Sequence, residues 1–228
     1  MRAFIGGTLG YGGWITMRKA IVGILTVLSG PALADPVVIA ALGDSLTQGY
    51  GLPQEDGFVP QLESWLREQG ADVQVLNAGV SGDTTAGGLS RAAWTLTPDV
   101  DAMIVTLGGN DLLRGIDPAN SRANLDGILQ AAADADVKVL LVGMQAPGNY
   151  GPEYKAAFDA MYPDLAEQYG TLYAPSFFEG MGGADTDPAA VRGLMQADGI
   201  HPNADGVLKV VEGLGPQVLK LIGQVPSG

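Results

Sequence analysis

Residues 37–51 read VVIAALGDSLTQGYG, an apolar run that passes directly into a polar segment with three glycines. Positions 37–42 are hydrophobic throughout, and four comparable runs follow along the chain, at residues 73–76, 102–107, 137–142 and 171–174. Runs that do not alternate with polar residues are typical of parallel strands buried on both faces. We therefore predict a sheet of five parallel strands.

Segments with the spacing of amphipathic helices separate these runs. Residues 152–169 are expected to form one helix, and residues 203–222 a last helix that is interrupted around residues 213–216. The apolar faces expected for three earlier helices are Phe58, Leu62, Trp65 and Leu66, then Leu89, Ala92, Ala93 and Leu96, then Leu125, Ile128, Leu129 and Ala132. Strands that alternate with helices predict an α/β fold, a single three-layer α/β/α sandwich.

The composition excludes several classes of function. The chain has 25 acidic and 12 basic residues and a formal charge of -13, the wrong sign for binding nucleic acid or an anionic lipid surface. It has no cysteine and a single histidine, His201, which excludes zinc sites built from thiolates or several imidazoles. A site made of carboxylates alone stays open, but we expect no metal and no cofactor.

The N-terminal region is typical of a signal peptide. Residues 17–34 read MRKAIVGILTVLSGPALA, with two basic residues, a short apolar stretch and a small-residue exit before Asp35. The stretch is shorter than the roughly 20 residues of a membrane span, so no stable membrane insertion of the mature chain is expected. We predict that translation starts at Met17, that cleavage follows Ala34, and that residues 35–228 form a single exported domain with nine basic and 25 acidic residues.

Polar, glycine-bearing loops follow the first three predicted strands. Ser45 follows the first, Asn77-Ala78-Gly79 the second, and Gly108-Gly109-Asn110-Asp111 the third. In open parallel sheets, ligands bind beyond the carboxyl ends of the strands, where the strand order reverses. The three loops are therefore expected to converge on one site.

These loops hold the residue types that a serine hydrolase needs. A serine nucleophile requires a base, an orienting group for that base, and donors for the oxyanion. His201 is the only histidine available as base, and Asp198 precedes it by three residues, close enough to accept a hydrogen bond from its ring. The backbone N–H groups of Ser45 and Gly79 and the side-chain amide of Asn110 are candidate oxyanion donors.

Each of these residues alone has a plainer interpretation. Ser45 lacks the Gly-x-Ser-x-Gly frame of a nucleophile elbow, and serines after strands are most often turn or capping residues. Ser81 is the rival nucleophile, and we interpret it as the cap of a helix that begins near Thr84. The conjunction of three loops with the Asp198–His201 pair favours catalysis by Ser45.

The residues also resemble a known family, the SGNH or GDSL hydrolases. The four blocks of that family are present in order as GDSL with Ser45, NAGVSG with Gly79, GGND with Asn110, and DGIHP with Asp198 and His201. The chain is most similar to the exported bacterial branch described as acyl-CoA thioesterase I, arylesterase or lysophospholipase L1. The resemblance implies a flavodoxin-like fold, an acyl-serine intermediate, no metal, and a loop at residues 145–154 that shapes the acyl pocket.

The expected function is a periplasmic or secreted serine esterase. We expect it to hydrolyse small acyl esters and thioesters, with arylesters and lysophospholipids among them. We expect it to bind small-molecule substrates and not nucleic acid, and we favour a monomeric protein. Two alternatives stay open: a carbohydrate O-deacetylase with the same machinery, and a periplasmic binding module without turnover.

Overall fold

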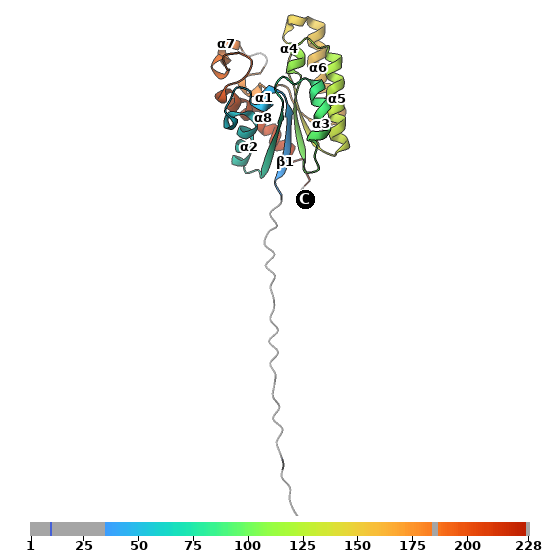
Figure 1. Ribbon diagram of the computed structural model, residues 1–228, viewed down its shortest axis with the longest axis vertical. Helices are drawn as coiled ribbons and strands as arrows, with labels where there is room; N and C mark the ends of the chain where they lie inside the picture. Colours follow the sequence, from blue (N-terminus) through green and yellow to red (C-terminus); the bar gives the residue numbers. More distant parts are fainter. Residues whose placement is uncertain (1–9, 11–34, 184–186, 227–228) are drawn as a thin grey trace, which may run out of the picture. The chain divides into compact units, whose positions relative to one another are not determined.

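A computed structural model describes residue 10, residues 35–183 and residues 187–226 of the chain (Figure 1). Five strands form one sheet in the order β2-β1-β3-β4-β5, and each neighbouring pair is parallel. The strands are β1 (Val37–Gly43), β2 (Val73–Gly79), β3 (Ala102–Thr106), β4 (Lys138–Val142) and β5 (Leu172–Ala174). The predicted α/β class and the five-stranded parallel sheet are confirmed.

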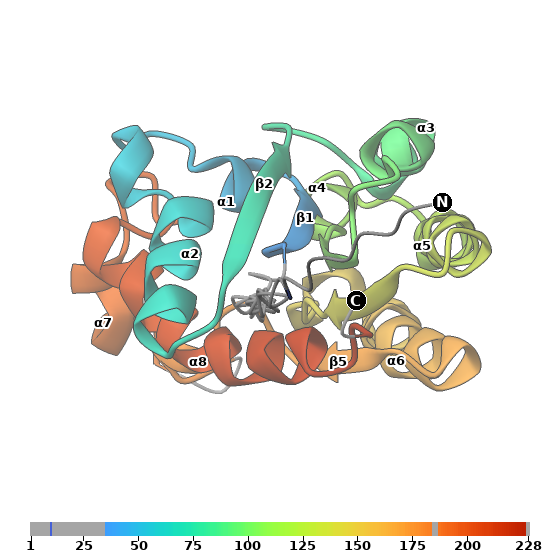
Figure 2. The same cartoon turned by 90° about the horizontal axis from the view of Figure 1, so that it is seen from below.

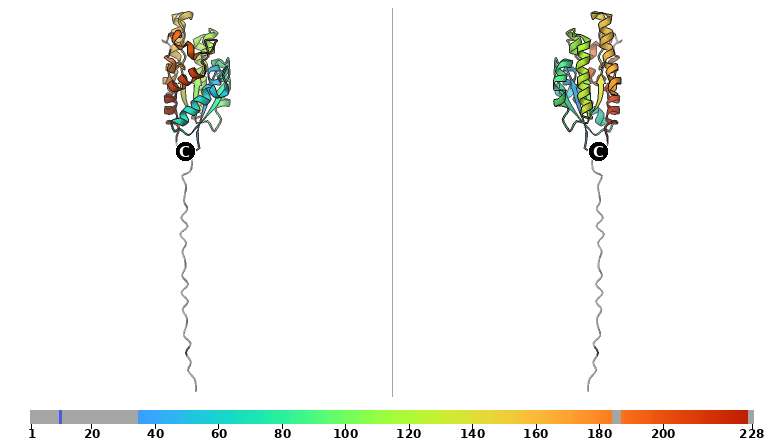
Figure 3. Two further views of the ribbon diagram at one scale, coloured as in Figure 1. Left: turned by 90° about the vertical axis from the view of Figure 1, so that its left-hand side faces the viewer. Right: turned by 90° about the vertical axis from the view of Figure 1, so that its right-hand side faces the viewer.

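Helices cover both faces of the sheet (Figure 2). On one face α2 (Phe58–Glu68) packs against α8 (Ala204–Ile222), and on the other α5 (Pro118–Asp134) lies between α3 (Thr85–Thr95) and α6 (Pro152–Tyr169). The two views of Figure 3 display these two layers in turn. The short helices are α1 (Ser45–Gln48), α4 (Gly109–Leu113), α7 (Pro188–Val191), and the 3-10 turns η1 (Gln54–Asp56), η2 (Gly148–Tyr150), η3 (Glu179–Met181) and η4 (Arg192–Leu194).

The expected apolar faces of α2 and α5 are buried, apart from the partly buried Trp65, but that of α3 is not. Of the four residues expected there, Ala92 is buried, whereas Leu89 and Ala93 are exposed. The buried face of α3 runs instead through Thr85, Gly88 and Ala92. Gly88 allows this rotation because the side chain of Leu107 occupies the space where a Cβ would lie.

The expected interruption of the last helix is wrong, since α8 is continuous through residues 213–216. The glycines in this stretch serve close packing. A Cβ on Gly213 would lie 2.5 Å from the backbone nitrogen of Gly180, and one on Gly215 would meet the ring of Trp65. Pro216 is accommodated inside the helix at the loss of one backbone hydrogen bond. Tertiary contact therefore overrides the local helix-breaking signal.

The strand order reverses at β1, which lies between β2 and β3. The chain leaves the carboxyl end of β1 into α1 and that of β3 into α4, and both short helices lie at the same edge of the sheet (Figure 1). This edge is where a parallel α/β sheet builds a ligand site. Among the described residues, no helix is both long enough and apolar enough to cross a bilayer.

Candidate active site

Ser45 is the first residue of α1, two residues after the carboxyl end of β1 at Gly43. Asp44 is the N-cap of this helix, and its Oδ1 accepts the N–H of Leu46 at 3.0 Å. Gly43 permits the sharp turn, because a Cβ there would collide with the side chain of Thr47. The cap and the turn together fix Ser45 at the sheet edge, on the wall of a pocket.

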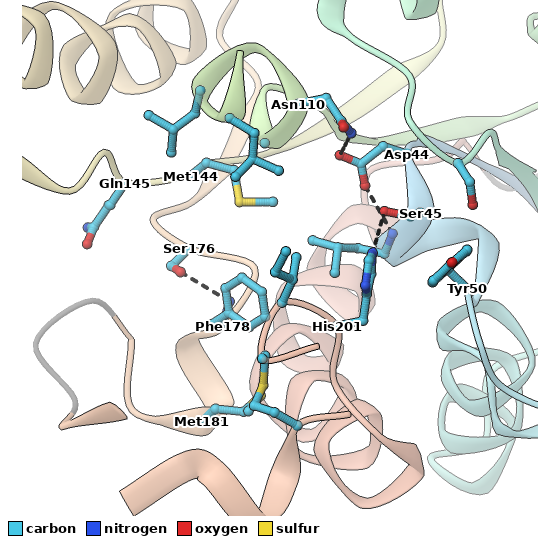
Figure 4. A pocket seen from close by; sticks show the side chains of 18 of the residues that line it. Asp44, Ser45, Tyr50, Asn110, Met144, Gln145, Ser176, Phe178, Met181 and His201 are labelled. Atoms are coloured by element: carbon cyan, nitrogen blue, oxygen red, sulfur yellow. Dashed lines mark hydrogen bonds between the residues drawn. The ribbon is translucent and has the colours of Figure 1, made fainter. Parts of the chain in front are cut away.

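A chain of hydrogen bonds joins Ser45, His201 and Asp198, and Figure 4 shows the link between His201 and Ser45. His201 Nε2 lies 2.9 Å from Ser45 Oγ, and His201 Nδ1 lies 2.7 Å from Asp198 Oδ2. The hydrogen bond from the His201 ring, followed by those from two backbone N–H groups, lowers the pKa of Asp198 to about 2. An ionised Asp198 accepts a hydrogen bond from the N–H at Nδ1, which leaves the Nε2 lone pair directed at Ser45.

The loop that carries His201 is held by Gln196, a residue that the sequence reasoning missed. The backbone N–H of Gln196 donates to the carbonyl of His201 at 2.8 Å. Its side-chain amide donates to the carbonyls of Tyr50 at 2.8 Å and Pro202 at 3.0 Å. The ring of Tyr50 lies against that of His201, with centroids 4.7 Å apart. Gln196 thus ties the histidine loop to the turn that follows α1.

Asn110 lies in the first turn of α4, across the pocket from His201 (Figure 4). Gly108, with φ +118°, makes the turn into this helix, and the hydroxyl of Tyr162 occupies the space beside it. Asn110 Nδ2 donates to Asp44 Oδ2 at 3.2 Å. Because an amide nitrogen has two N–H groups, one is left for a substrate.

The structure does not place Gly79 where the sequence reasoning expected it. Its N–H donates to Asn77 Oδ1 at 3.0 Å, and it is absent from the pocket wall. Glycine is needed there because a Cβ would lie 2.8 Å from the Cα of Gln48. Gly82, three residues further on, does line the pocket, with φ +80°. The sequence shows a glycine at each position, but not which backbone N–H faces the cavity.

The N–H groups of Ser45 and Gly82 share a property that suits them to bind an oxyanion. Within the described part of the chain, neither donates to another group. The carbonyl of Gly82 accepts a hydrogen bond from Arg114 at 2.8 Å, which fixes the peptide that follows Gly82. These two N–H groups and the remaining amide N–H of Asn110 therefore belong to residues that line the same pocket.

Ser81 also lines the pocket, but its surroundings differ from those of Ser45. Its hydroxyl donates to Gln48 Oε1 at 2.8 Å, and His201, the only histidine, is bonded to Ser45 instead. The expectation that Ser81 caps α3 is wrong, because the N-cap is Thr84, whose side chain accepts the N–H of Gly87. Ser81 lacks a base.

Two groups beneath the pocket fix the loops that form it. Arg91 pairs with Asp83 at 2.8 Å and donates to the carbonyls of Gly43 and Ala78, so it joins the ends of β1 and β2. Fully buried Asp111, next to Asn110, accepts hydrogen bonds from Thr85 and Ser121 and so anchors α4 to α3 and α5. Neither role is visible in the sequence, because the partners lie far apart along the chain.

The pocket has a volume of about 520 Å³ and a largely apolar wall. Of residues 145–154, expected to shape it, Gln145 alone lines it. Most of the apolar wall comes from segments that the sequence reasoning did not assign, and its main side chains are Leu112, Met144, Phe178, Met181, Met195 and Ile200. Such a cavity suits an acyl chain.

Asp44 is the one acidic side chain on the pocket wall, and it is 2% exposed. Burial raises its pKa to about 6, against the lowering effect of the hydrogen bonds from Leu46 and Asn110. Within residues 35–183 and 187–226, no three acidic or histidine side chains are grouped so as to hold a metal ion.

Comparison with known proteins gives consistent matches. Residues 41–207 match the GDSL-like Lipase/Acylhydrolase family. The chain is 41% identical over 199 residues to the Esterase TesA of Pseudomonas aeruginosa, covering 87% of this chain and 94% of that protein. It is 35% identical over 193 residues to the Thioesterase 1/protease 1/lysophospholipase L1 of Escherichia coli strain K12, covering 84% and 86%.

A solved structure matches equally well. The crystal structure of AlinE4, an SGNH-hydrolase family esterase, superposes with a TM-score of 0.67 at 43% identity, covering 83% of this chain and 98% of that one. The family match spans more than half of the chain, and the relatives match over nearly their whole length. This chain belongs to the GDSL-like lipase/acylhydrolase family.

Proposed function

We propose that this protein is a serine esterase that hydrolyses acyl esters and thioesters through an acyl-serine intermediate. The observation that carries the proposal is the hydrogen-bonded chain from Ser45 through His201 to Asp198 at the wall of an apolar pocket. The names of its relatives, esterase and thioesterase 1/lysophospholipase L1, support the same reaction class.

The reaction begins with Ser45 Oγ attacking the acyl carbonyl carbon while His201 Nε2 takes the hydroxyl proton. The carbonyl oxygen becomes an oxyanion, which the N–H groups of Ser45 and Gly82 and the free amide N–H of Asn110 stabilise. Gly82 takes the place that the sequence reasoning gave to Gly79. Ionised Asp198 stabilises the imidazolium that forms.

The second half of the reaction releases the two products. His201 passes its proton to the leaving alcohol or thiol as the carbon–oxygen or carbon–sulfur bond breaks. Water then attacks the acyl-serine, with His201 again taking a proton and returning it to Ser45 Oγ. Every proton that His201 takes up in these steps is passed on, and each bond that forms is matched by one that breaks.

The pocket wall bears on the substrate. Apolar side chains such as Leu112, Met144 and Phe178 contribute most of the surface around the nucleophile. An acyl chain buries there favourably, at about 0.8 kcal/mol per methylene. This favours acyl esters and thioesters over the acetylated sugars of an O-deacetylase, whose hydroxyl groups would lie against apolar atoms.

The decisive experiment compares two serines on the same pocket wall. Ser45→Ala should abolish hydrolysis of p-nitrophenyl acetate and labelling by an organophosphate, whereas Ser81→Ala should keep both. Equal turnover by Ser45→Ala and the parent protein would sink the proposal. A parent protein that neither hydrolyses the ester nor is labelled at Ser45 would point to a binding module instead.

We also propose that the protein is exported, with residues 1–34 removed. The basis is the signal-like segment at residues 17–34, which lies outside the described residues. Expression of the full gene followed by cell fractionation and N-terminal sequencing tests this. A mature protein that begins at Asp35 in the exported fraction is expected, and an intact N-terminus at Met1 in the cell interior would contradict it.

A further inference from the structure

The mechanism above leaves one buried charged group without a role. Asp44 adjoins the nucleophile and is 2% exposed, yet within the described residues it has no ion-pair partner. A carboxyl group buried without a countercharge costs stability. Such a cost at this place calls for a functional reason.

The two oxygens of Asp44 serve different partners. Oδ1 accepts the N–H of Leu46 and caps α1 at 3.0 Å, whereas Oδ2 accepts Asn110 Nδ2 at 3.2 Å, across 66 positions of sequence (Figure 4). Capping alone needs one acceptor, which serine, threonine or asparagine supplies equally well. The second oxygen therefore needs a separate explanation.

The side chain of Asn110 has a donor end and an acceptor end of nearly the same shape. A carboxylate offers acceptors only, so Asp44 Oδ2 pairs with the nitrogen end of the amide and not with its oxygen. We propose that Asp44 is a positioning residue that selects the orientation of the Asn110 amide, so that an N–H and not a carbonyl oxygen meets the oxyanion. The inference rests on the proposed function of Asn110 as an oxyanion donor.

Asp44 is not placed to act as the base itself. Ser45 Oγ is bonded to His201 Nε2, and the contacts of Asp44 are with Leu46 and Asn110. Its negative charge would by itself oppose an oxyanion nearby. Removing the charge and losing the amide orientation therefore have opposite effects on the rate, which makes the sign of a mutational effect informative.

Asp44→Asn separates these effects. The new side chain has almost the same shape and still caps α1 through its oxygen, which turns its NH₂ group toward Asn110. The Asn110 amide must then flip and present its oxygen to the oxyanion. We expect kcat on p-nitrophenyl acetate to fall roughly 10²-fold, on the scale of one lost oxyanion donor, with KM nearly unchanged.

A double-mutant cycle with Asn110→Ala tests the route of the effect. If Asp44 acts through Asn110, adding Asp44→Asn to Asn110→Ala should change kcat by less than about threefold. Asp44→Ser serves as the companion variant, because it keeps a capping oxygen but places no amide opposite Asn110. Its kcat should fall less than that of Asp44→Asn. Thermal unfolding of every variant establishes that each is folded.

The outcomes separate this inference from the function on which it rests. Multiplicative losses in the double variant, or an unchanged or raised kcat in Asp44→Asn, would overturn the positioning role while leaving the esterase proposal intact. An unchanged kcat in Asn110→Ala would remove Asn110 from the oxyanion hole and this inference with it. If an organophosphate failed to label Ser45 in the parent protein, the proposed function itself would be overturned.

Discussion

Replacing Asp198 by two different residues probes how the base is oriented. Asp198 Oδ1 accepts the backbone N–H groups of Ile200 at 2.9 Å and His201 at 3.0 Å, while Oδ2 faces His201 Nδ1 at 2.7 Å. In Asp198→Asn, the backbone donors keep the amide oxygen on their side. The NH₂ group must then face Nδ1.

An NH₂ group opposite Nδ1 forces the wrong tautomer on His201. Nδ1 becomes an acceptor and Nε2 carries the proton, so the ring cannot take the proton of Ser45. We expect kcat to fall roughly 10⁴-fold, the effect of a wrong tautomer in a serine triad, which corresponds to about 5 kcal/mol of transition-state stabilisation.

Asp198→Ala should be the milder substitution. The side chain of Asp198 is 37% exposed, so water can reach Nδ1 and accept its proton once the carboxylate is gone. We expect the loss of kcat to be roughly tenfold smaller than in Asp198→Asn. Steady-state hydrolysis of p-nitrophenyl acetate by both purified variants, at matched thermal stability, measures the ratio. An alanine variant as slow as the asparagine variant would refute the tautomer argument.

Four further outcomes follow from the same geometry. Turnover should fall at acid pH, because only a neutral imidazole can take the proton of Ser45, and a flat rate profile would remove His201 as base. Gly82→Ala should lower kcat, because it strains a φ of +80° at an oxyanion donor. Gly79→Ala should lower the melting temperature more than it lowers kcat, because the new Cβ meets the backbone of α1. The reverse pattern would restore Gly79 to the site. Gln196→Ala loses two side-chain hydrogen bonds, so the free energy of unfolding measured by urea titration should fall by about 2 kcal/mol, and kcat/KM should fall with it. An unchanged urea midpoint would show that other contacts hold the histidine loop. Burial raises the pKa of Asp44 in the folded state from 3.8 to about 6, so its contribution to stability is complete below pH 3.8 and is lost as the pH rises through 6. The free energy of unfolding of Asp44→Asn should therefore exceed that of the parent protein by up to about 3 kcal/mol toward pH 7. Stability curves that stay parallel across this pH range would contradict the prediction.

The inner strands could be predicted because parallel strands buried on both faces are largely apolar, as in β3, where all five residues are buried. Helix faces were less certain where glycine takes part. Gly88 in α3 and Gly215 in α8 look like breaks in a helical pattern, but each makes room for a neighbouring side chain, Leu107 in one case and Trp65 in the other. A sequence records that a side chain is absent and does not record what fills the space.

The site was predictable where elimination applied. A single histidine leaves one candidate base, and Asp198 lies three residues from it. The choice between Gly79 and Gly82 depends on backbone torsion and on whether Asn77 takes the N–H, and neither has a sequence signal. The pocket wall was missed for a similar reason, since Met181 ends one short 3-10 turn and Met195 follows another, and such turns have no hydrophobic periodicity.

Two carboxylates solve the same chemical problem on opposite sides of Ser45. A histidine ring and an asparagine amide can each face either way, and both are useful in one orientation only. Asp198 and Asp44 each place one oxygen on backbone N–H groups and the other on the ambivalent side chain. Their environments differ, and acid therefore reaches them in order: the pKa of exposed Asp198 lies at about 2, and that of buried Asp44 at about 6. Acidification should disturb the oxyanion side of the site well before it disturbs the tautomer of the base.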